Sequence, residues 1–251
     1  MSYLNQEILL NRLEHFWGFG RYESECWFIG MEEGGGDEIQ EVAKRLAVWE
    51  RLGSPELIDN FEYHLGISGY GYENFFEGKI KLQNTWKKLI RAYLNIENPN
   101  KDYSVEDIKE FQAHYWGREN SNNCLLDIFP LPSPSSNKWY YGKWCEIPIL
   151  RSRDTYKSAL RDKRINTLRK RISTHNPKVV IFYAFDSNYV KIWEQVAEIK
   201  FTSKNNYKIF KDKSVYLSKR EETIFVVTYQ PSAVWNNQYW NNVGKFVHDQ
   251  F

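Results

Sequence analysis

The chain has 251 residues, of which 42% are hydrophobic and 26% are charged, and this is the composition of an ordinary globular protein. No window approaches the apolar length that a membrane span needs, and the N-terminal segment lacks a signal-peptide core. The three cysteines have no ligand-like spacing, which favours a reducing compartment and argues against a structural zinc site. We therefore expect a cytoplasmic monomer that makes no membrane contact.

The distribution of charge along the chain and the aromatic content are more informative than the overall composition. Residues 1–60 carry 5 basic and 12 acidic side chains, whereas residues 151–171 carry 9 basic and 2 acidic ones. This asymmetry favours a positive surface for a polyanion, although a solvated basic helix is the simpler explanation. Aromatic residues make up 17% of the chain, and rings in excess of those needed for a core can stack on bases or sugars.

Apolar spacing and capping residues predict mostly helices in the first half. In chain order they are a helix over Leu4–Phe16, a strand over Cys26–Gly30, a helix capped by Asp37, a helix starting at Ser54-Pro55, a helix face carrying Leu82–Leu94, and a helix over Ser104–Trp116 opened by a capping box. The aromatic segment Gly66–Gly78 is punctuated by glycines and reads as a loop.

The second half alternates strands and helices. The predicted elements are a strand over Cys124–Phe129, a basic helix over Thr155–His175, a strand over Lys178–Phe185, a helix over Asn188–Ala197, strands over Lys208–Phe210, Ser214–Leu217 and Thr223–Thr228, and a final helix with Trp235, Tyr239, Val243, Phe246 and Val247 on one face. This order predicts one α/β domain over residues 1–251, with a central, mainly parallel sheet flanked by helices.

Four segments carry residues suited to chemistry, and three of them lie at the ends of predicted strands: Met31–Gly36, Phe129–Trp144 and Tyr229–Trp235. The fourth is the loop Gly66–Gly78. In open α/β sheets, ligands bind outside the carboxyl ends of the strands, so we expect the three segments at strand ends to meet. Met31–Gly36 is rich in glycine but lacks the pattern of a phosphate-binding loop, and its carboxylates would repel an anion. Those carboxylates favour a general base, stabilisation of a cation, or a hard metal ion, whereas a solvated acidic turn is the alternative.

The three motifs in this order resemble those of the uracil-DNA glycosylase superfamily. The residues that carry the resemblance are Gly30-Met31-Glu32-Glu33-Gly34, Asp127-Ile128-Phe129-Pro130-Leu131 and Gln230-Pro231-Ser232-Ala233. The resemblance implies that the whole chain has the fold of that superfamily. It also implies an enzyme without a cofactor that flips a modified base out of DNA and hydrolyses its N-glycosidic bond.

The resemblance assigns two catalytic residues. Glu32 stands where the family commonly has Asp or Asn, and a carboxylate there would orient water and stabilise the cationic sugar. Gln230 stands where the family usually has the His that stabilises the departing base, and an amide donor does this less strongly. Glu33 replaces the usual Pro, and two adjacent carboxylates could raise one pKa or bind a cation.

Asp127 stands where the family has a base-reading Asn. An ionised carboxylate can only accept hydrogen bonds, so uracil would lose one bond, at a cost of about 1–3 kcal/mol. We therefore expect a preference for an edge with two donors, such as a purine edge or an amino-bearing lesion. A raised pKa at Asp127 would remove this expectation.

The remaining candidates surround these positions. Base-binding candidates, besides Asp127, are Met31, Phe129, Tyr70 and Tyr72. Candidates for DNA contact are Ser232, Lys138, Trp139, Lys143, Trp144, Arg161 and Arg164, chosen because basic and aromatic residues alternate or because the helix is basic. For each ring, packing in the core is the alternative. The five histidines are scattered and predict no site.

Three other functions fit the same residues. One is a nucleic-acid-binding protein of the same fold that recognises a lesion without cutting it. Another is a metal-dependent nucleotide or phosphate hydrolase that binds Mg²⁺ or Mn²⁺ through Glu32, Glu33, Asp37 and Asp127. The last is a structural or protein-binding role.

Overall fold

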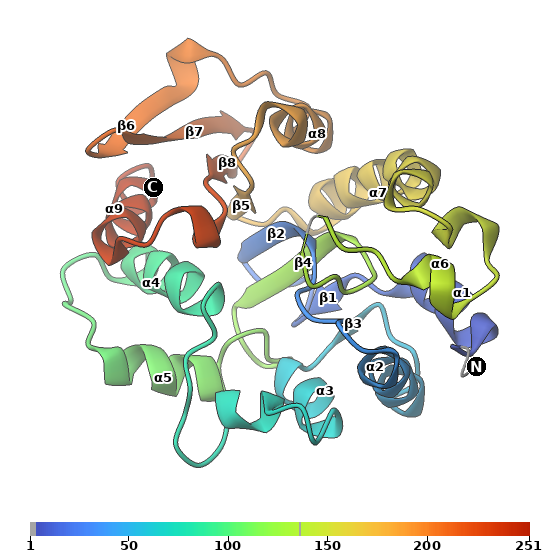
Figure 1. The fold of residues 1–251 in the computed structure, drawn as a ribbon. Helices are drawn as coiled ribbons and strands as arrows, with labels where there is room; N and C mark the ends of the chain where they lie inside the picture. The colour runs from blue at the N-terminus through green and yellow to red at the C-terminus, as the bar shows by residue number, and fades with distance from the viewer. Residues whose placement is uncertain (1–3, 136) are drawn as a thin grey trace.

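The computed structural model describes residues 4–135 and 137–251, and its centre is one eight-stranded sheet in the order β3-β1-β4-β2-β5-β8-β7-β6 (Figure 1). The strands are β1 (Gly18–Phe19), β2 (Cys26–Glu32), β3 (Leu57–Ile58), β4 (Asn123–Phe129), β5 (Val179–Tyr183), β6 (Asn206–Phe210), β7 (Lys213–Arg220) and β8 (Thr223–Thr228). The four central strands, β4, β2, β5 and β8, are parallel, whereas β1, β7 and β6 join the sheet through antiparallel pairs. The predicted α/β class with a mainly parallel sheet is confirmed.

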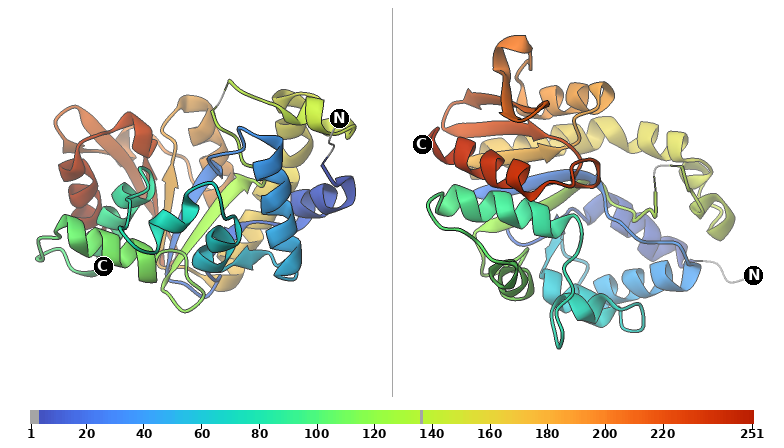
Figure 2. Two further views of the ribbon diagram at one scale, coloured as in Figure 1. Left: turned by 60° about the horizontal axis from the view of Figure 1, so that its bottom comes forward. Right: turned by 60° about the vertical axis from the view of Figure 1, so that its left-hand side comes forward.

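Helices connect the strands and cover both faces of the sheet (Figures 1 and 2). The α-helices are α1 (Gln6–His15), α2 (Ile39–Arg51), α3 (Asn60–Gly66), α4 (Trp86–Glu97), α5 (Val105–His114), α6 (Tyr141–Trp144), α7 (Arg153–His175), α8 (Ser187–Ala197) and α9 (Asn237–His248). Short 3₁₀ turns lie at η1 (Tyr72–Phe75), η2 (Pro148–Leu150), η3 (Ser203–Asn205) and η4 (Pro231–Ala233). Within the described residues, no helix is both long and apolar enough to cross a membrane.

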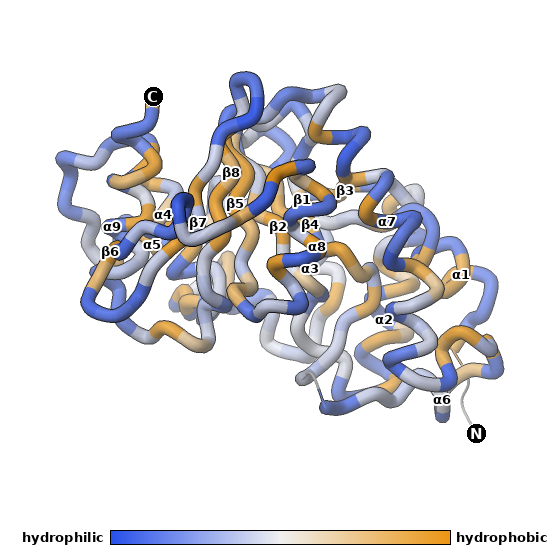
Figure 3. Tube along the Cα trace, turned by 90° about the horizontal axis from the view of Figure 1, so that it is seen from above, coloured by the Kyte–Doolittle hydropathy of each residue, from blue (hydrophilic) through white to orange (hydrophobic). Residues whose placement is uncertain are grey.

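Side-chain alternation along the strands builds a core on each face of the sheet. On β2, Trp27 and Ile29 face the core formed with α1, α7 and α8, whereas Cys26 and Phe28 face the core formed with α4, α5 and α9. Helix α2 contributes to both cores. Because the central strands are buried on both faces, they are apolar throughout, and Figure 3 shows β5 and β8 as hydrophobic segments between hydrophilic loops.

Several element boundaries differ from the prediction. Strand β2 continues past Gly30 to Glu32, because Glu32 still pairs with Phe129 of β4. The helix predicted at Ser54-Pro55 is wrong: Ser54 has φ +53° and is followed by β3, and α3 begins only after its cap Asp59. Trp235 lies outside α9 and is 77% exposed.

Candidate functional site

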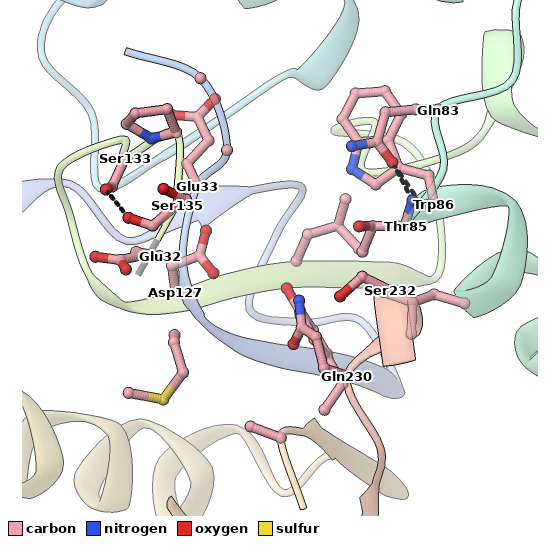
Figure 4. Close-up of a pocket in the computed structure, with 18 of the residues that line it drawn as sticks. Glu32, Glu33, Gln83, Thr85, Trp86, Asp127, Ser133, Ser135, Gln230 and Ser232 are labelled. Atoms are coloured by element: carbon pink, nitrogen blue, oxygen red, sulfur yellow. Dashed lines mark hydrogen bonds between the residues drawn. The ribbon is translucent and has the colours of Figure 1, made fainter. Parts of the chain in front are cut away.

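A cavity of about 930 Å³ lies at the carboxyl ends of the central strands. It is lined by residues 31–35 at the end of β2, by Asp127 of β4 and residues 133–135 of the loop that follows, by residues 183–186 at the end of β5, and by residues 229–230 and 232–233 after β8. Its far wall includes Gln83, Thr85 and Trp86 (Figure 4). This volume is within the range of small-molecule sites. The three segments singled out in the sequence therefore all contribute to one cavity.

The topology of the sheet explains why the cavity forms here. After β2 the chain forms β4 on one side of β2 and then β5 on the other side. The connections at the carboxyl end of β2 therefore run to opposite sides of this strand, and a crevice forms between them. Gly30 leaves room beside β2 for the ring of Tyr183, because a Cβ at Gly30 would lie only 2.2 Å from the hydroxyl oxygen of Tyr183. The absent side chain at Gly30 thus admits Tyr183 to the cavity wall.

Glu32 lies at the end of β2 and is held by cations from α7. Its Oε1 accepts a hydrogen bond from Arg153, and the Nζ of Lys157 is 4.0 Å away. Arg153 is itself fixed, since its Nη2 donates to the carbonyl oxygens of Ser135 at 2.6 Å and Lys138 at 2.8 Å. The second oxygen of Glu32, Oε2, is buried and has no hydrogen-bond partner among the described residues. Glu32 is thus oriented through one oxygen, while the other is buried without a partner in the described structure.

Glu33 has a different environment, in which it neutralises buried arginines. It is bound to Arg45 of α2 and lies 3.4 Å from Nη2 of Arg12 of α1, and both arginines are at most 1% exposed. The ring of His64 is 3.7 Å away, and burial lowers the pKa of His64 to about 4 against the opposing charge of Glu33. His64 is therefore neutral at pH 7. The charge at Glu33 is tolerated because it is paired.

Asp127 lies on β4 opposite Gly30 and lines the cavity. Its Oδ1 is buried without a hydrogen-bond partner among the residues that the structure describes. Burial, followed by the negative charges of Glu33 and Glu32, raises the pKa of Asp127 to about 8. The expectation that Asp127 favours two donors assumed an ionised carboxylate, and this raised pKa removes it: Asp127 is mostly protonated at pH 7.

The loop after β8 supplies Gln230 and Ser232, which are exposed and line the cavity (Figure 4). A buried lysine of α4 holds this loop. The Nζ of Lys88, which is 2% exposed, donates to the carbonyl oxygens of Pro231 and Val234, the latter at 2.8 Å. Lys88 is thus a positioning residue that the sequence did not reveal.

The other base-binding candidates divide into two groups. Met31 and Tyr72 line the cavity, and the Tyr72 hydroxyl lies 2.7 Å from Arg45. Phe129 is 1% exposed, packs against Tyr156 in the core and is not among the residues that line the cavity. Tyr70 is half-buried against the hydrophobic core and is not among the lining residues.

The candidates for DNA contact also differ in their surroundings. Arg164 is 2% exposed and donates to the carbonyl oxygens of Phe16, Asp127 and Ile128, so it links core segments and has no surface from which to contact DNA. Trp139 is half-buried and stacks on Tyr156 at 4.7 Å.

The remaining candidates lie nearer the surface. Trp144 is half-buried and packs on Tyr140 and Tyr141. Lys143 and Arg161 are exposed. Lys138 is exposed and pairs with Asp37 at 3.3 Å. Among the cations proposed for DNA contact, Lys138, Lys143 and Arg161 are therefore exposed, whereas Arg164 is buried.

The carboxylates do not form a metal site in the described parts of the chain. No group of three or more His, Cys, Asp or Glu side chains there is arranged to hold a metal ion. Glu32 and Glu33 each have an oxygen bound to an arginine, and Asp37 pairs with Lys138. The donor set therefore does not favour the metal-dependent alternative.

Comparisons with known proteins identify no family. No family model matches the sequence, and no curated protein matches it. The functional argument therefore rests on the geometry of the cavity.

Proposed function

We propose that the cavity takes up a modified base extruded from DNA and that the protein hydrolyses its N-glycosidic bond. The observation that carries the proposal is the convergence of three sequence motifs, separated by about a hundred residues each, on one cavity. Met31 to Gly34, Asp127, and Gln230 with Ser232 all line it. Flipped bases need such a pocket, because their reactive atoms are inaccessible inside the duplex.

Glu32 is the residue proposed to act on the sugar and water. Its carboxylate lines the cavity and can accept a hydrogen bond from the attacking water, and the charge stabilises the developing oxocarbenium ion. Arg153 orients the carboxylate but also shares its charge. This pairing predicts slower catalysis than an unpaired carboxylate would give.

Gln230 and Ser232 are proposed to bind the other parts of the nucleotide. The Gln230 amide can donate to a base oxygen as negative charge develops there. Ser232, exposed at the same loop, suits a backbone phosphate. Because Lys88 fixes this loop through two carbonyl oxygens, both side chains start from a defined backbone.

A binding protein without catalysis is the second candidate, and one observation favours it. The only carboxylate that the motifs place at the water position, Glu32, is already paired with Arg153 and approached by Lys157. In that case the protein would recognise a base and leave the glycosidic bond intact.

Base release from defined oligonucleotides tests the proposal. The panel contains uracil, hypoxanthine, xanthine and alkylated bases, each in single- and double-stranded DNA, with and without a chelator. We expect chelator-resistant abasic sites for at least one base, and a rate lowered by about 10²–10⁴ in Glu32→Gln.

Glu38→Gln is the matched control, because Glu38 is an exposed carboxylate just before α2 and does not line the cavity. It should release base at the wild-type rate. Binding without release on every substrate would support the binding protein instead. Release that a chelator abolishes would contradict the proposal.

A further inference from the structure

The cavity contains a carboxyl group with one oxygen that has no hydrogen-bond partner among the described residues. Asp127 reaches the cavity from β4, and its Oδ1 is buried with no partner in the described residues. A buried acceptor without a partner loses its hydration, so a ligand that supplies the missing bond gains affinity. The surroundings of this carboxyl determine which ligand edge fits.

No cation around Asp127 pairs with its carboxylate in the described structure. Arg164 of α7 donates to backbone carbonyls, including that of Asp127 itself. Arg12 of α1 binds Glu33 and the Tyr63 hydroxyl.

The other titratable groups that influence Asp127 are not cationic. They are the carboxylates of Glu32 and Glu33 at the end of β2, and the buried phenol of Tyr183 on β5. Burial, and then the charge of Asp127 and a hydrogen bond with it, raise the pKa of Tyr183. Glu32 and Glu33 are paired with arginines, whereas an ionised Asp127 beside them would be a further negative charge with no counterion in the described structure, which is costly. Its pKa of about 8 agrees with this placement.

We propose that Asp127 binds its ligand as a neutral carboxylic acid and selects a heterocycle edge on which an N–H donor lies beside an acceptor. The neutral acid has one O–H donor and one carbonyl acceptor side by side, so it forms two hydrogen bonds with such an edge. The pattern is the same as that of an Asn amide. The inference rests on the proposed function only in taking the ligand to be a nucleobase.

This pairing excludes some ligands and makes recognition dependent on pH. Two adjacent donors, as in an amidinium group, complement the ionised carboxylate instead. A methyl group on the ring N–H removes the donor and one bond. As the pH rises through the pKa of Asp127, the O–H donor is lost, and with it the preference for a donor beside an acceptor.

Equilibrium binding of free bases to the full-length protein tests this inference without requiring catalysis. The probes are uracil and hypoxanthine for a carbonyl acceptor, cytosine for a ring-nitrogen acceptor, 3-methyluracil for a blocked donor, and benzamidine for two donors. We expect at least one of the first three to bind at pH 6 and to weaken by about tenfold at pH 9, because about nine tenths of Asp127 is then ionised. Benzamidine should show the opposite trend.

Asp127→Asn is the matched variant, because it keeps the donor and acceptor at every pH. It should bind the same base at pH 6 and retain that affinity at pH 9, which also corrects for ionisation of the base. Equal binding of uracil and 3-methyluracil, or a wild-type affinity that does not change with pH while Asp127→Asn binds, would overturn the inference. Failure of base release alone leaves this result unaffected, so the two proposals are separable.

Discussion

At the scale of single residues, the adjacent carboxylates at the end of β2 have different partners. Glu32 turns toward Arg153 and Lys157 and keeps one oxygen unpartnered within the described structure. Glu33 turns the other way and neutralises Arg12 and Arg45. The pair resembles a single acidic patch in the sequence, but one carboxylate belongs to the cavity chemistry and the other to the buried charge network.

Glu33→Gln should destabilise the protein strongly. Removing the charge leaves two buried arginines with less compensation, and breaking a buried pair costs about 3–5 kcal/mol. Urea unfolding at pH 7 measures the change in the free energy of unfolding. Glu38→Gln, a surface change, should alter it by less than about 1 kcal/mol. A similarly small loss for Glu33→Gln would show that the network does not depend on this carboxylate.

Asp127→Asn should stabilise the protein increasingly as pH rises. The pKa of Asp127 is about 8 in the folded protein, whereas the ordinary value of an Asp side chain, which applies to the unfolded chain, is 3.8. Folding therefore favours the protonated form of Asp127. The wild type has this stabilisation in full below about pH 4 and loses it as pH rises toward 8. Asn does not titrate.

Urea unfolding of both proteins at pH 5 and pH 8 measures this effect. The advantage of Asp127→Asn should be larger at pH 8 by on the order of 2–4 kcal/mol. An advantage that is equal at the two pH values would mean that Asp127 titrates normally.

At the scale of elements, helices that do not carry the motifs hold the site in place. The first residue of α7, Arg153, binds Glu32 and the carbonyl oxygens of the loop after β4. From the opposite face of the sheet, Lys88 of α4 binds the loop after β8. Helix α4 lies beside α9 (Figure 2), so the packing of these two helices also supports that loop.

Gly244→Ala should destabilise the contact between α4 and α9. In an exposed helix this change stabilises by about 0.5–1 kcal/mol. Here the new Cβ would lie 2.2 Å from the carbonyl oxygen of Ala92 and 2.6 Å from the Cβ of Asn95, so the helices must separate. Thermal unfolding should show a net loss of about 1–3 kcal/mol.

Lys245→Ala places the same side chain on the exposed face of α9 and should be nearly neutral. If Gly244→Ala proved more stable than the wild type, the two helices would not pack as closely as described.

At the scale of the whole molecule, the sequence predicts those features that depend on local pattern. Continuous apolar runs predicted β5 and β8, and the capping box at Ser104 is present. Two-residue strands could not be predicted, because β1 is defined by pairing with β3 and with distant β4.

Buried charge is the other feature that local pattern does not reveal. Arg164 and Lys88 have the sequence context of exposed helix residues, yet each is buried because its donors reach backbone carbonyls distant in the sequence. The ion pair of Glu32 joins positions 121 residues apart, which no spacing rule detects. The motifs therefore predicted where the cavity forms but not how its charges are compensated.

The most direct test of the account is the single-turnover rate of base release by the wild type and Glu32→Gln on the best substrate of the panel. The account predicts chelator-resistant release that slows by about 10²–10⁴ in the variant, while the affinity for the oligonucleotide is unchanged. Equal rates for the two proteins would contradict the assignment of Glu32 as the group that acts on water and the sugar.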